Sequence, residues 1–372
     1  MSATPLAGLT VVEFTHMVMG PAAGGILAAL GADVVRVEPP GGDHTRTLIG
    51  SGAGYFPMYN RHKASVTIDL KSAEGLAAAT RLATEADILI ENFRPGALDR
   101  LGLGYDALAA ANPRLIYCTL KGFLPGPYQD RTALDEVAQM MGGLAYMTGP
   151  PGRPLRAGAS VIDVTGGMFG VIAILAAVEE RHRTGRGQKV AAALFETTVY
   201  LVGQHMAQKV VTGQAAAPMP ARVSAWAIYD VFETRDEPVF VGVVTDALWQ
   251  KFCELFGLDD LWADETLRRN NDRVRARDRI LPRVRAMLGE MTCAQVIARL
   301  DGSGLPFAPI ARPEDLFDDP HLLASDGLES VTMPDGAEAR LPRVPLELDG
   351  ARPGGSSRLP QPGADNDGLP SG

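Results

Sequence analysis

Short apolar, β-branched runs alternate with Ala-rich or amphipathic stretches along the first 120 residues. The run at 9–14 (LTVVEF), then Gly20-Pro21 and an Ala/Gly/Leu-rich stretch to Leu30, predict a strand followed by a tightly packed helix. Because 33–38 (DVVRVE) has the pattern of a second strand, the opening is a βαβ unit with parallel strands. Further strands are predicted at 65–70, 87–91 and 114–120, and helices at 73–85 and 105–112. This alternation predicts a doubly wound, Rossmann-like α/β fold.

A Gly/Pro-rich passage at 142–158 interrupts the alternation. After it, 159–163 runs into a long apolar helix, and the charged sequence 179–183 marks where that helix leaves the core. A strand at 188–194 and a helix ending near Thr212 follow. These elements extend the first domain beyond residue 200.

A second domain is predicted after Ala215–Ala221 (AAAPMPA), which has the composition of a linker. Its elements are strands at 228–232, 239–244 and 307–310 and helices at 247–256, 273–291 and 293–300. From Ala351 onward Pro, Gly and Ser dominate, which is typical of a surface or disordered tail. We therefore expect a Rossmann-like large domain (1–215), a small α+β domain (222–330), and a C-terminal segment (331–372) that returns to the large domain and ends in a flexible tail.

The composition limits the kinds of partner. A net charge of −9 over 372 residues argues against a nucleic-acid surface, but not against a small basic pocket for a phosphorylated cofactor. Cys118, Cys253 and Cys293 are odd in number and far apart, which favours a reducing compartment and offers no zinc site. The N-terminus has no signal-peptide pattern, and the apolar run 168–178 is shorter than the roughly 20 residues of a membrane span. We expect a cytoplasmic protein with neither a metal nor a membrane partner.

Six short motifs occur in order along the chain. They are Val11-Val12-Glu13-Phe14-Thr15-His16 with Gly20-Pro21, Leu30-Gly31-Ala32-Asp33-Val34-Val35-Arg36-Val37-Glu38, Glu91-Asn92-Phe93-Arg94-Pro95-Gly96, Lys121-Gly122-Phe123 with Gly126-Pro127-Tyr128, Gly158-Ala159-Ser160-Val161-Ile162-Asp163 with Gly166, and Arg183-Thr184-Gly185-Arg186-Gly187-Gln188. Together they resemble the family III (CaiB/BaiF-type) CoA-transferases, which include formyl-CoA:oxalate and carnitine CoA-transferases and the α-methylacyl-CoA racemases. The resemblance covers nearly the whole chain. It implies an interlocked homodimer that moves coenzyme A from an acyl-CoA to a small carboxylic acid, with no permanently bound cofactor.

Asp163 is the candidate catalytic residue. It stands where a strand-like segment meets the start of the long helix, so its carboxylate lies at the positive end of the helix dipole. Local sequence alone favours a helix N-cap, a position that Asp commonly takes. The resemblance instead implies that Asp163 is the nucleophile, which forms first a mixed anhydride and then an aspartyl-CoA thioester. Backbone N–H groups of Gly122, Gly142 or Gly143 are candidates to stabilise the oxyanions of these steps.

The resemblance also implies a set of coenzyme A contacts. His16 follows the first strand, at the sheet edge where α/β proteins bind ligands, although a structural histidine is the alternative. Lys71 and Arg100 are equally consistent with ordinary solvated charges. The implied contacts are His16, Met17, Ile68, Lys71, Asn92, Phe93, Arg100 and Lys121.

The chain departs from the family pattern in two places. Racemases of the family place a histidine before an aspartate where this chain has Leu134-Asp135, and a leucine cannot carry a proton. Oxalate-using members have a glycine run before Trp226, where this chain has 218–222 (PMPAR). Racemisation is therefore disfavoured, and oxalate is in doubt as the acceptor.

A third interpretation is a non-catalytic CoA-binding protein or a dinucleotide-binding module. No G-x-G-x-x-G follows the first strand, and Gly20, Gly24 and Gly25 have the wrong spacing for one. The dinucleotide alternative is therefore weak, and Asp163 in a matching motif argues against an inert carrier.

Overall fold

The computed structural model describes residues 4–222, 224–354 and 357–368. These residues form two units: a larger one, up to Pro220 and again from Pro320, and a smaller one, from Ala221 to Asp319. The sequence placed the second boundary at 330, about ten residues later. Pro320–Ala324 (α14) and the strand after it therefore belong to the larger unit.

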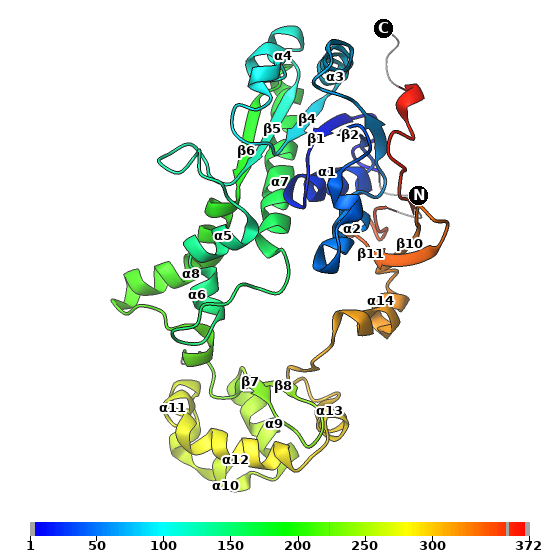
Figure 1. The fold of residues 1–372 in the computed structure, drawn as a ribbon. Coiled ribbons are helices and arrows are strands. Elements are labelled where there is room, and N and C mark those ends of the chain that lie inside the picture. Colours follow the sequence, from blue (N-terminus) through cyan, green and yellow to red (C-terminus); the bar gives the residue numbers. More distant parts are fainter. Residues whose placement is uncertain (1–3, 223, 355–356, 369–372) are drawn as a thin grey trace. The chain divides into compact units, whose positions relative to one another are not determined.

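The larger unit is built on a six-stranded sheet with the order β3-β2-β1-β4-β5-β6 (Figure 1). All five strand pairs are parallel, which confirms the predicted α/β fold with a parallel sheet. The strands are β1 (Thr10–Phe14), β2 (Asp33–Glu38), β3 (Ala64–Thr67), β4 (Ile88–Glu91), β5 (Ile116–Lys121) and β6 (Lys189–Ala193). The strand order reverses at β1, so the carboxyl ends of β1 and β4 form the topological switch point.

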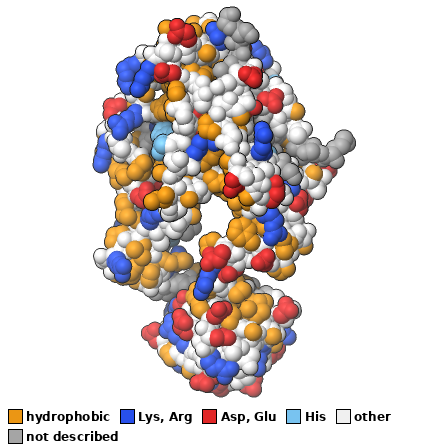
Figure 2. All heavy atoms as spheres, turned by 45° about the vertical axis from the view of Figure 1, so that its right-hand side comes forward, with side chains coloured by type: hydrophobic (Ala, Val, Ile, Leu, Met, Phe, Trp, Pro, Cys, Tyr) orange, Lys and Arg blue, Asp and Glu red, His pale blue; other side chains and the backbone are white. Residues whose placement is uncertain are grey.

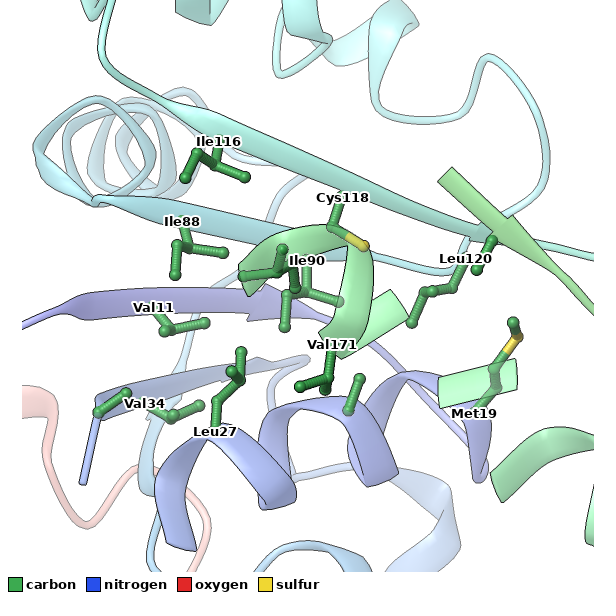
Figure 3. Packing of buried hydrophobic residues seen from close by; sticks show 14 of the residues in the cluster. Val11, Met19, Leu27, Val34, Ile88, Ile90, Ile116, Cys118, Leu120 and Val171 are labelled. Atoms are coloured by element: carbon green, nitrogen blue, oxygen red, sulfur yellow. The ribbon is translucent and has the colours of Figure 1, made fainter. Parts of the chain in front are cut away.

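Apolar side chains cover both faces of this sheet because successive strand residues point to opposite sides. Val11 packs under α1 (Met19–Ala29) and α7 (Val161–Thr184), whereas Val12 belongs to the cluster under α3 (Ala73–Glu85) and α4 (Tyr105–Ala111). Strand, α1 and α7 side chains of the first cluster interdigitate in Figure 3. The core therefore lies in two layers, one on each side of the sheet.

Several short elements escaped the sequence pattern, because three to seven residues are too few to show a period. They are η1 (His44–Thr47), η2 (Gly50–Gly54), α2 (Tyr55–Tyr59), η3 (Asp99–Leu101), α5 (Asp135–Met141), α6 (Leu144–Thr148), η6 (Pro313–Asp318, in the smaller unit) and η7 (Asn366–Gly368). The predicted helix from Leu194 is α8 (Leu194–Thr212), and η4 (Met219–Ala221) falls in the predicted linker. Helix α5 proves to matter for the site.

The described part of the tail, which the sequence left as either surface-hugging or disordered, is hydrogen-bonded to the edge of the sheet. Strand β10 (Leu328–Thr332) pairs with β11 (Glu338–Pro342) and with β12 (Ser357–Arg358). Beyond them, the N–H of Ser65 donates to Asp365 at 2.7 Å and the N–H of Thr67 donates to Asn366 at 2.8 Å. The reason is that β3 is an edge strand, whose free N–H groups these side chains satisfy. Residues 355–356 and 369–372 of the predicted tail lie outside the described residues.

The smaller unit has a three-stranded antiparallel sheet, β7-β8-β9, covered by helices around Trp249 and Phe252. This agrees with the α+β pattern. The predicted helix 273–291 is two helices, because the chain bends at Ala276. Its elements are β7 (Tyr229–Phe232), β8 (Val239–Gly242), α9 (Asp246–Phe256), α10 (Asp259–Ala263), η5 (Glu265–Leu267), α11 (Asn270–Arg275), α12 (Arg277–Gly289), α13 (Cys293–Leu300) and β9 (Phe307–Pro309).

Helix α7 is long and apolar enough to cross a membrane by length and composition, and it is the one such helix in the described part of the chain. The core helix of a soluble protein passes the same test. Here α7 packs against α1, β5 and β6, and 44% of its most apolar stretch is buried. Its role in the fold is thus that of a core helix with one exposed apolar side.

Candidate active site

The side chains that follow β1 and β4 meet at the switch point of the sheet. The His16 N–H donates to Oδ1 of Asn92 at 2.9 Å, and Nδ2 of Asn92 donates to the His16 carbonyl at 2.9 Å. Phe93 stacks on the His16 ring with centroids 5.5 Å apart. Three of the predicted contacts thus form one interlocked pair of loops, where doubly wound folds bind ligands.

A cleft of about 670 Å³ opens beside this pair of loops, entirely within the larger unit. Seven of the nine predicted site residues line it, although they come from five separate segments of the chain. They are His16, Met17, Asn92, Phe93, Arg100, Lys121 and Asp163. A cavity of this size accommodates a cofactor or a drug-sized ligand.

Ile68 and Lys71 are not among the residues that line the cleft. The Ile68 side chain is 5% exposed and packs in the core beside Val66, because residues two apart on an extended chain point to the same face. Lys71 is exposed in the turn after β3. The structure therefore offers no Ile68 side chain to a ligand and leaves Lys71 outside this cleft.

Asp163 is the third residue of α7, three positions after the N-cap, so the N-cap interpretation is wrong. The N-cap position is Ser160, whose side chain makes no capping hydrogen bond. Helix α7 lies so close to α1 that a Cβ on Gly167 would stand 2.7 Å from the Met19 carbonyl oxygen. This contact brings Asp163 to the same cleft as the His16 loop.

The Asp163 carboxylate accepts no hydrogen bond from any residue that the structure describes, although its own N–H is bonded. Burial, together with the nearby charges of Asp135 and Glu136, raises the pKa of Asp163 to about 7. A carboxylate that is partly desolvated and without donors is more nucleophilic than one in water.

His16 and Met17 carry signs of a ligand-binding loop. The Nδ1 of His16 is buried without a partner in the described residues, and burial lowers the pKa of the ring, so that it is neutral at physiological pH. Met17 has a φ of 59°, a left-handed conformation that costs a non-glycine residue free energy. Both residues line the cleft.

The cations of the cleft differ in how free they are. Nζ of Lys121 already binds Glu91 at 2.5 Å and donates to the Phe93 carbonyl at 2.6 Å. Arg94 and Arg100 are exposed, and within the described parts of the chain neither forms an ion pair. The two arginines are thus available for phosphate groups, whereas Lys121 chiefly fixes the Phe93 loop.

Comparison with known proteins identifies the family. A family model described as CoA-transferase family III matches residues 6–366. The chain belongs to CoA-transferase family III. An acetyl-CoA:oxalate CoA-transferase from Acetobacter aceti is 35% identical over 82% of this chain and 80% of that protein, and a succinate–glutarate CoA-transferase from Agrobacterium fabrum is 32% identical over 92% and 89%. The crystal structure of a CaiB/BaiF family protein from Brucella suis matches with a TM-score of 0.87, at 34% identity, over 99% of this chain and 98% of that one.

The chain is therefore a CoA-transferase, and the family III enzymes that it resembles take CoA thioesters as substrates. Tyr55, Arg94, Arg131 and Asp135 are among the other side chains that line the cleft of this family III member. Arg94 lies inside one of the recognised motifs, and Asp135 follows the Leu134 that distinguishes the chain from racemases. Tyr55 and Arg131 carry no signal in the sequence, because α2 and the loop before α5 show no periodic pattern.

Of the glycines considered for an oxyanion site, only Gly122 lines the cleft of this CoA-transferase. The Gly142 N–H is already donated to the Ala138 carbonyl, so it is not free for a substrate. In the described ranges, no group of three or more His, Cys, Asp or Glu side chains is placed to hold a metal ion. All three cysteines are buried free thiols.

Proposed function

We propose that this CoA-transferase uses Asp163 as a covalent nucleophile that carries the acyl and CoA groups in turn. The observation that supports this most directly is the Asp163 carboxylate itself. It faces a cleft at the switch point, at the N-terminus of a 24-residue helix, and no described residue hydrogen-bonds to it. Such a group is available to attack a thioester.

The proposed reaction balances without a proton donor. An Asp163 oxygen attacks the thioester carbonyl carbon, the C–S bond breaks, and CoA leaves as thiolate from a mixed anhydride. The thiolate then attacks the Asp163 carbonyl carbon, and the donor acid leaves as carboxylate from an aspartyl-CoA thioester. The acceptor carboxylate repeats both steps in reverse and releases the new acyl-CoA with Asp163 free.

Coenzyme A is proposed to bind along the His16 and Phe93 loops, with its phosphates near the free arginines. Asn92 orients the His16 loop through its two hydrogen bonds, and Lys121 holds the Phe93 loop. Lys71 remains a proposed contact for the nucleotide end beyond the cleft. Ile68 is proposed to contribute its backbone position only, because its side chain is buried.

The Arg100→Ala variant tests the placement of the phosphates. We expect the KM for acyl-CoA to rise roughly 10- to 150-fold with kcat within about twofold, because a charge-assisted hydrogen bond contributes roughly 1.5–3 kcal/mol. Steady-state kinetics with succinyl-CoA measures both constants. Lys251→Ala, which removes an exposed cation from α9 in the smaller unit, is the control. Equal effects of the two variants would contradict the assignment.

The acceptor is proposed to be a small carboxylic acid. The relatives above are named for oxalate and glutarate, so small dicarboxylic acids are the first to test. Oxalate itself is the less favoured of these, because 218–222 (PMPAR) stands where oxalate-using members have glycines.

A homodimer is proposed on the strength of exposed apolar side chains. Ile172 on α7 is 58% exposed, and Tyr200 and Val210 on α8 are 74% and 85% exposed. The space-filling view likewise shows hydrophobic side chains at the surface among charged ones (Figure 2). Monomeric proteins rarely expose apolar helix faces of this kind. Sedimentation equilibrium of the purified chain measures its mass in solution, which is that of two chains for a homodimer and of one chain for a monomer.

Racemisation is the second candidate, and Leu134 argues against it. Leu134 is 54% exposed and lines the cleft, where a racemase needs a second proton-carrying side chain. A leucine at that place leaves Asp163 without a partner on the opposite face of the substrate.

The decisive experiment is to trap the covalent intermediate. We expect succinyl-CoA to give a CoA adduct on Asp163 that hydroxylamine converts to a hydroxamate, and a new CoA ester only when a second acid is present. Intact-protein and peptide mass spectrometry detect both products. Asp130→Asn, which removes another carboxylate of the same cleft, should keep the adduct. If no adduct formed while an α-branched acyl-CoA exchanged its α-proton without added acid, the racemase candidate would replace the transferase.

A further inference from the structure

The first turn of α7 is held by a side chain from another helix. The N–H groups of Ile162 and Asp163 donate to the same oxygen, Oδ2 of Asp135, at 2.8 and 3.0 Å. Asp135 opens α5, 27 residues before Ile162. It supplies the cap that Ser160, at the N-cap position, does not.

Asp135 is itself fixed in place. Its side chain is buried, with the residue 4% exposed, and its second oxygen accepts a hydrogen bond from Nε2 of Gln139 one turn later. The other end of the Gln139 amide accepts the Ala157 N–H at 2.8 Å. One buried network therefore joins α5, the segment before α7 and the first turn of α7.

This network determines what Asp163 can do. Because its N–H is taken by Asp135, the Asp163 residue is anchored through its backbone, and its carboxylate remains without a donor. The fixed negative charge of Asp135 also disfavours a second charge beside it, whereas the exposed Glu136 is paired with Arg156 at 2.6 Å. The anchoring and the charge come from the same carboxylate.

We propose that Asp135 is a positioning residue for CoA transfer, which fixes the first turn of α7 so that the Asp163 carboxylate faces the cleft, and whose charge sets the pH at which Asp163 becomes reactive. The proposal rests on the proposed nucleophilic role of Asp163. The simpler alternative is that Asp135 only caps a helix. A cap alone would affect thermal stability and leave the pH profile unchanged.

Three variants separate the two roles. Asp135→Asn keeps an oxygen for the two N–H groups and removes the charge, Asp135→Ala removes both, and Glu136→Gln removes a nearby charge that, in the described part of the chain, forms its ion pair with Arg156 and not with α7. The measurements are the pH profile of kcat, the KM for succinyl-CoA, the Tm, and the rate of adduct formation on Asp163.

With Asp135→Asn, we expect the midpoint of the pH profile to fall by roughly one unit, because a neighbouring like charge has been removed. Glu136→Gln should shift it less, since Glu136 is exposed and ion-paired. With Asp135→Ala, kcat and the rate of adduct formation should fall roughly 10- to 100-fold through lost orientation, with KM within about threefold and a Tm lower by a few degrees.

The proposal would be overturned if Asp135→Ala lowered the Tm while both Asp135 variants kept the wild-type kcat and the wild-type midpoint of the pH profile. Asp135 would then be a helix cap only. The titration of Asp163 can also be measured without turnover. For each protein, the pH dependence of the free energy of unfolding is compared with that of the same protein carrying Asp163→Asn, and the difference reports Asp163. If the wild type formed no adduct at all, the nucleophilic role would fall, whereas an adduct in every variant at an unchanged rate would remove the positioning role alone.

Discussion

The Asp163→Asn variant is expected to lose CoA transfer by roughly 10³-fold or more in kcat, because the reaction then has no atom to carry the acyl and CoA groups. The amide fills the same space and removes only the nucleophilic oxygen and its charge. The wild type should gain activity as the pH rises through about 7, the pKa to which burial raises Asp163, since only the ionised form attacks the thioester. Steady-state transfer between succinyl-CoA and glutarate, from pH 5.5 to 8.5, measures both effects.

The same variant should be at least as stable as the wild type above pH 7. The pKa of Asp163 is higher in the folded state than its ordinary value of 3.8, so between these values the folded state holds a proton that the unfolded state has lost. The stability that this proton provides is present at low pH and is lost as the pH rises through about 7. Asparagine removes that loss. Urea unfolding of both proteins at pH 5 and pH 8 tests this prediction. A lower free energy of unfolding for Asp163→Asn than for the wild type at pH 8 would indicate that Asp163 serves the fold.

Much of the larger unit was predictable, because its signals are local. The bounds of β2 and α3 agree with the predicted 33–38 and 73–85, since a β-branched run and an N-cap Ser72 mark them within a few residues. The place of His16 also followed from chain order, because it comes soon after the first strand, at the sheet edge where α/β proteins bind ligands. Asn92 was named only through the family resemblance, and the structure places it after β4, against His16.

The features that were missed depend on contacts between distant segments. The bonds from Ile162 and Asp163 to Asp135 join two helices across the Gly/Pro-rich passage, and no local pattern shows them. The burial of the Ile68 side chain could not be predicted either, since a motif transfers a position along the chain but not the direction in which the side chain points. The sequence left open whether the tail lies along the surface or is disordered, because its composition does not show that Asp365 and Asn366 meet the edge of β3.

The Glu13→Ala variant is expected to lose roughly 3–5 kcal/mol of the free energy of unfolding, since it leaves buried cations without their counterion. Glu13 is fully buried and accepts from Nζ of Lys63 at 2.8 Å and from Arg36 at 3.0 Å. Helix α1 lies so close above it that a Cβ on Gly24 would stand 1.8 Å from a Glu13 oxygen. Water cannot readily replace the lost carboxylate in so tight a space. Urea unfolding at neutral pH measures the change.

The pH dependence of this loss identifies its cause. Burial lowers the pKa of Lys63 to about 8, and without Glu13 the pKa falls further, so the unfolded state binds a proton that the folded state gives up. The stability of Glu13→Ala should therefore recover relative to the wild type as the pH rises from 6 to 9. A Glu13→Gln/Lys63→Met double variant, which removes the pair together, should be more stable than Glu13→Ala. If the free energy of unfolding fell equally in Glu13→Ala and in the double variant, at every pH, the cause would instead be a cavity. Because Arg36 also donates to Thr15 beside His16, at 3.1 Å, charge loss at Glu13 should weaken CoA binding as well as the fold.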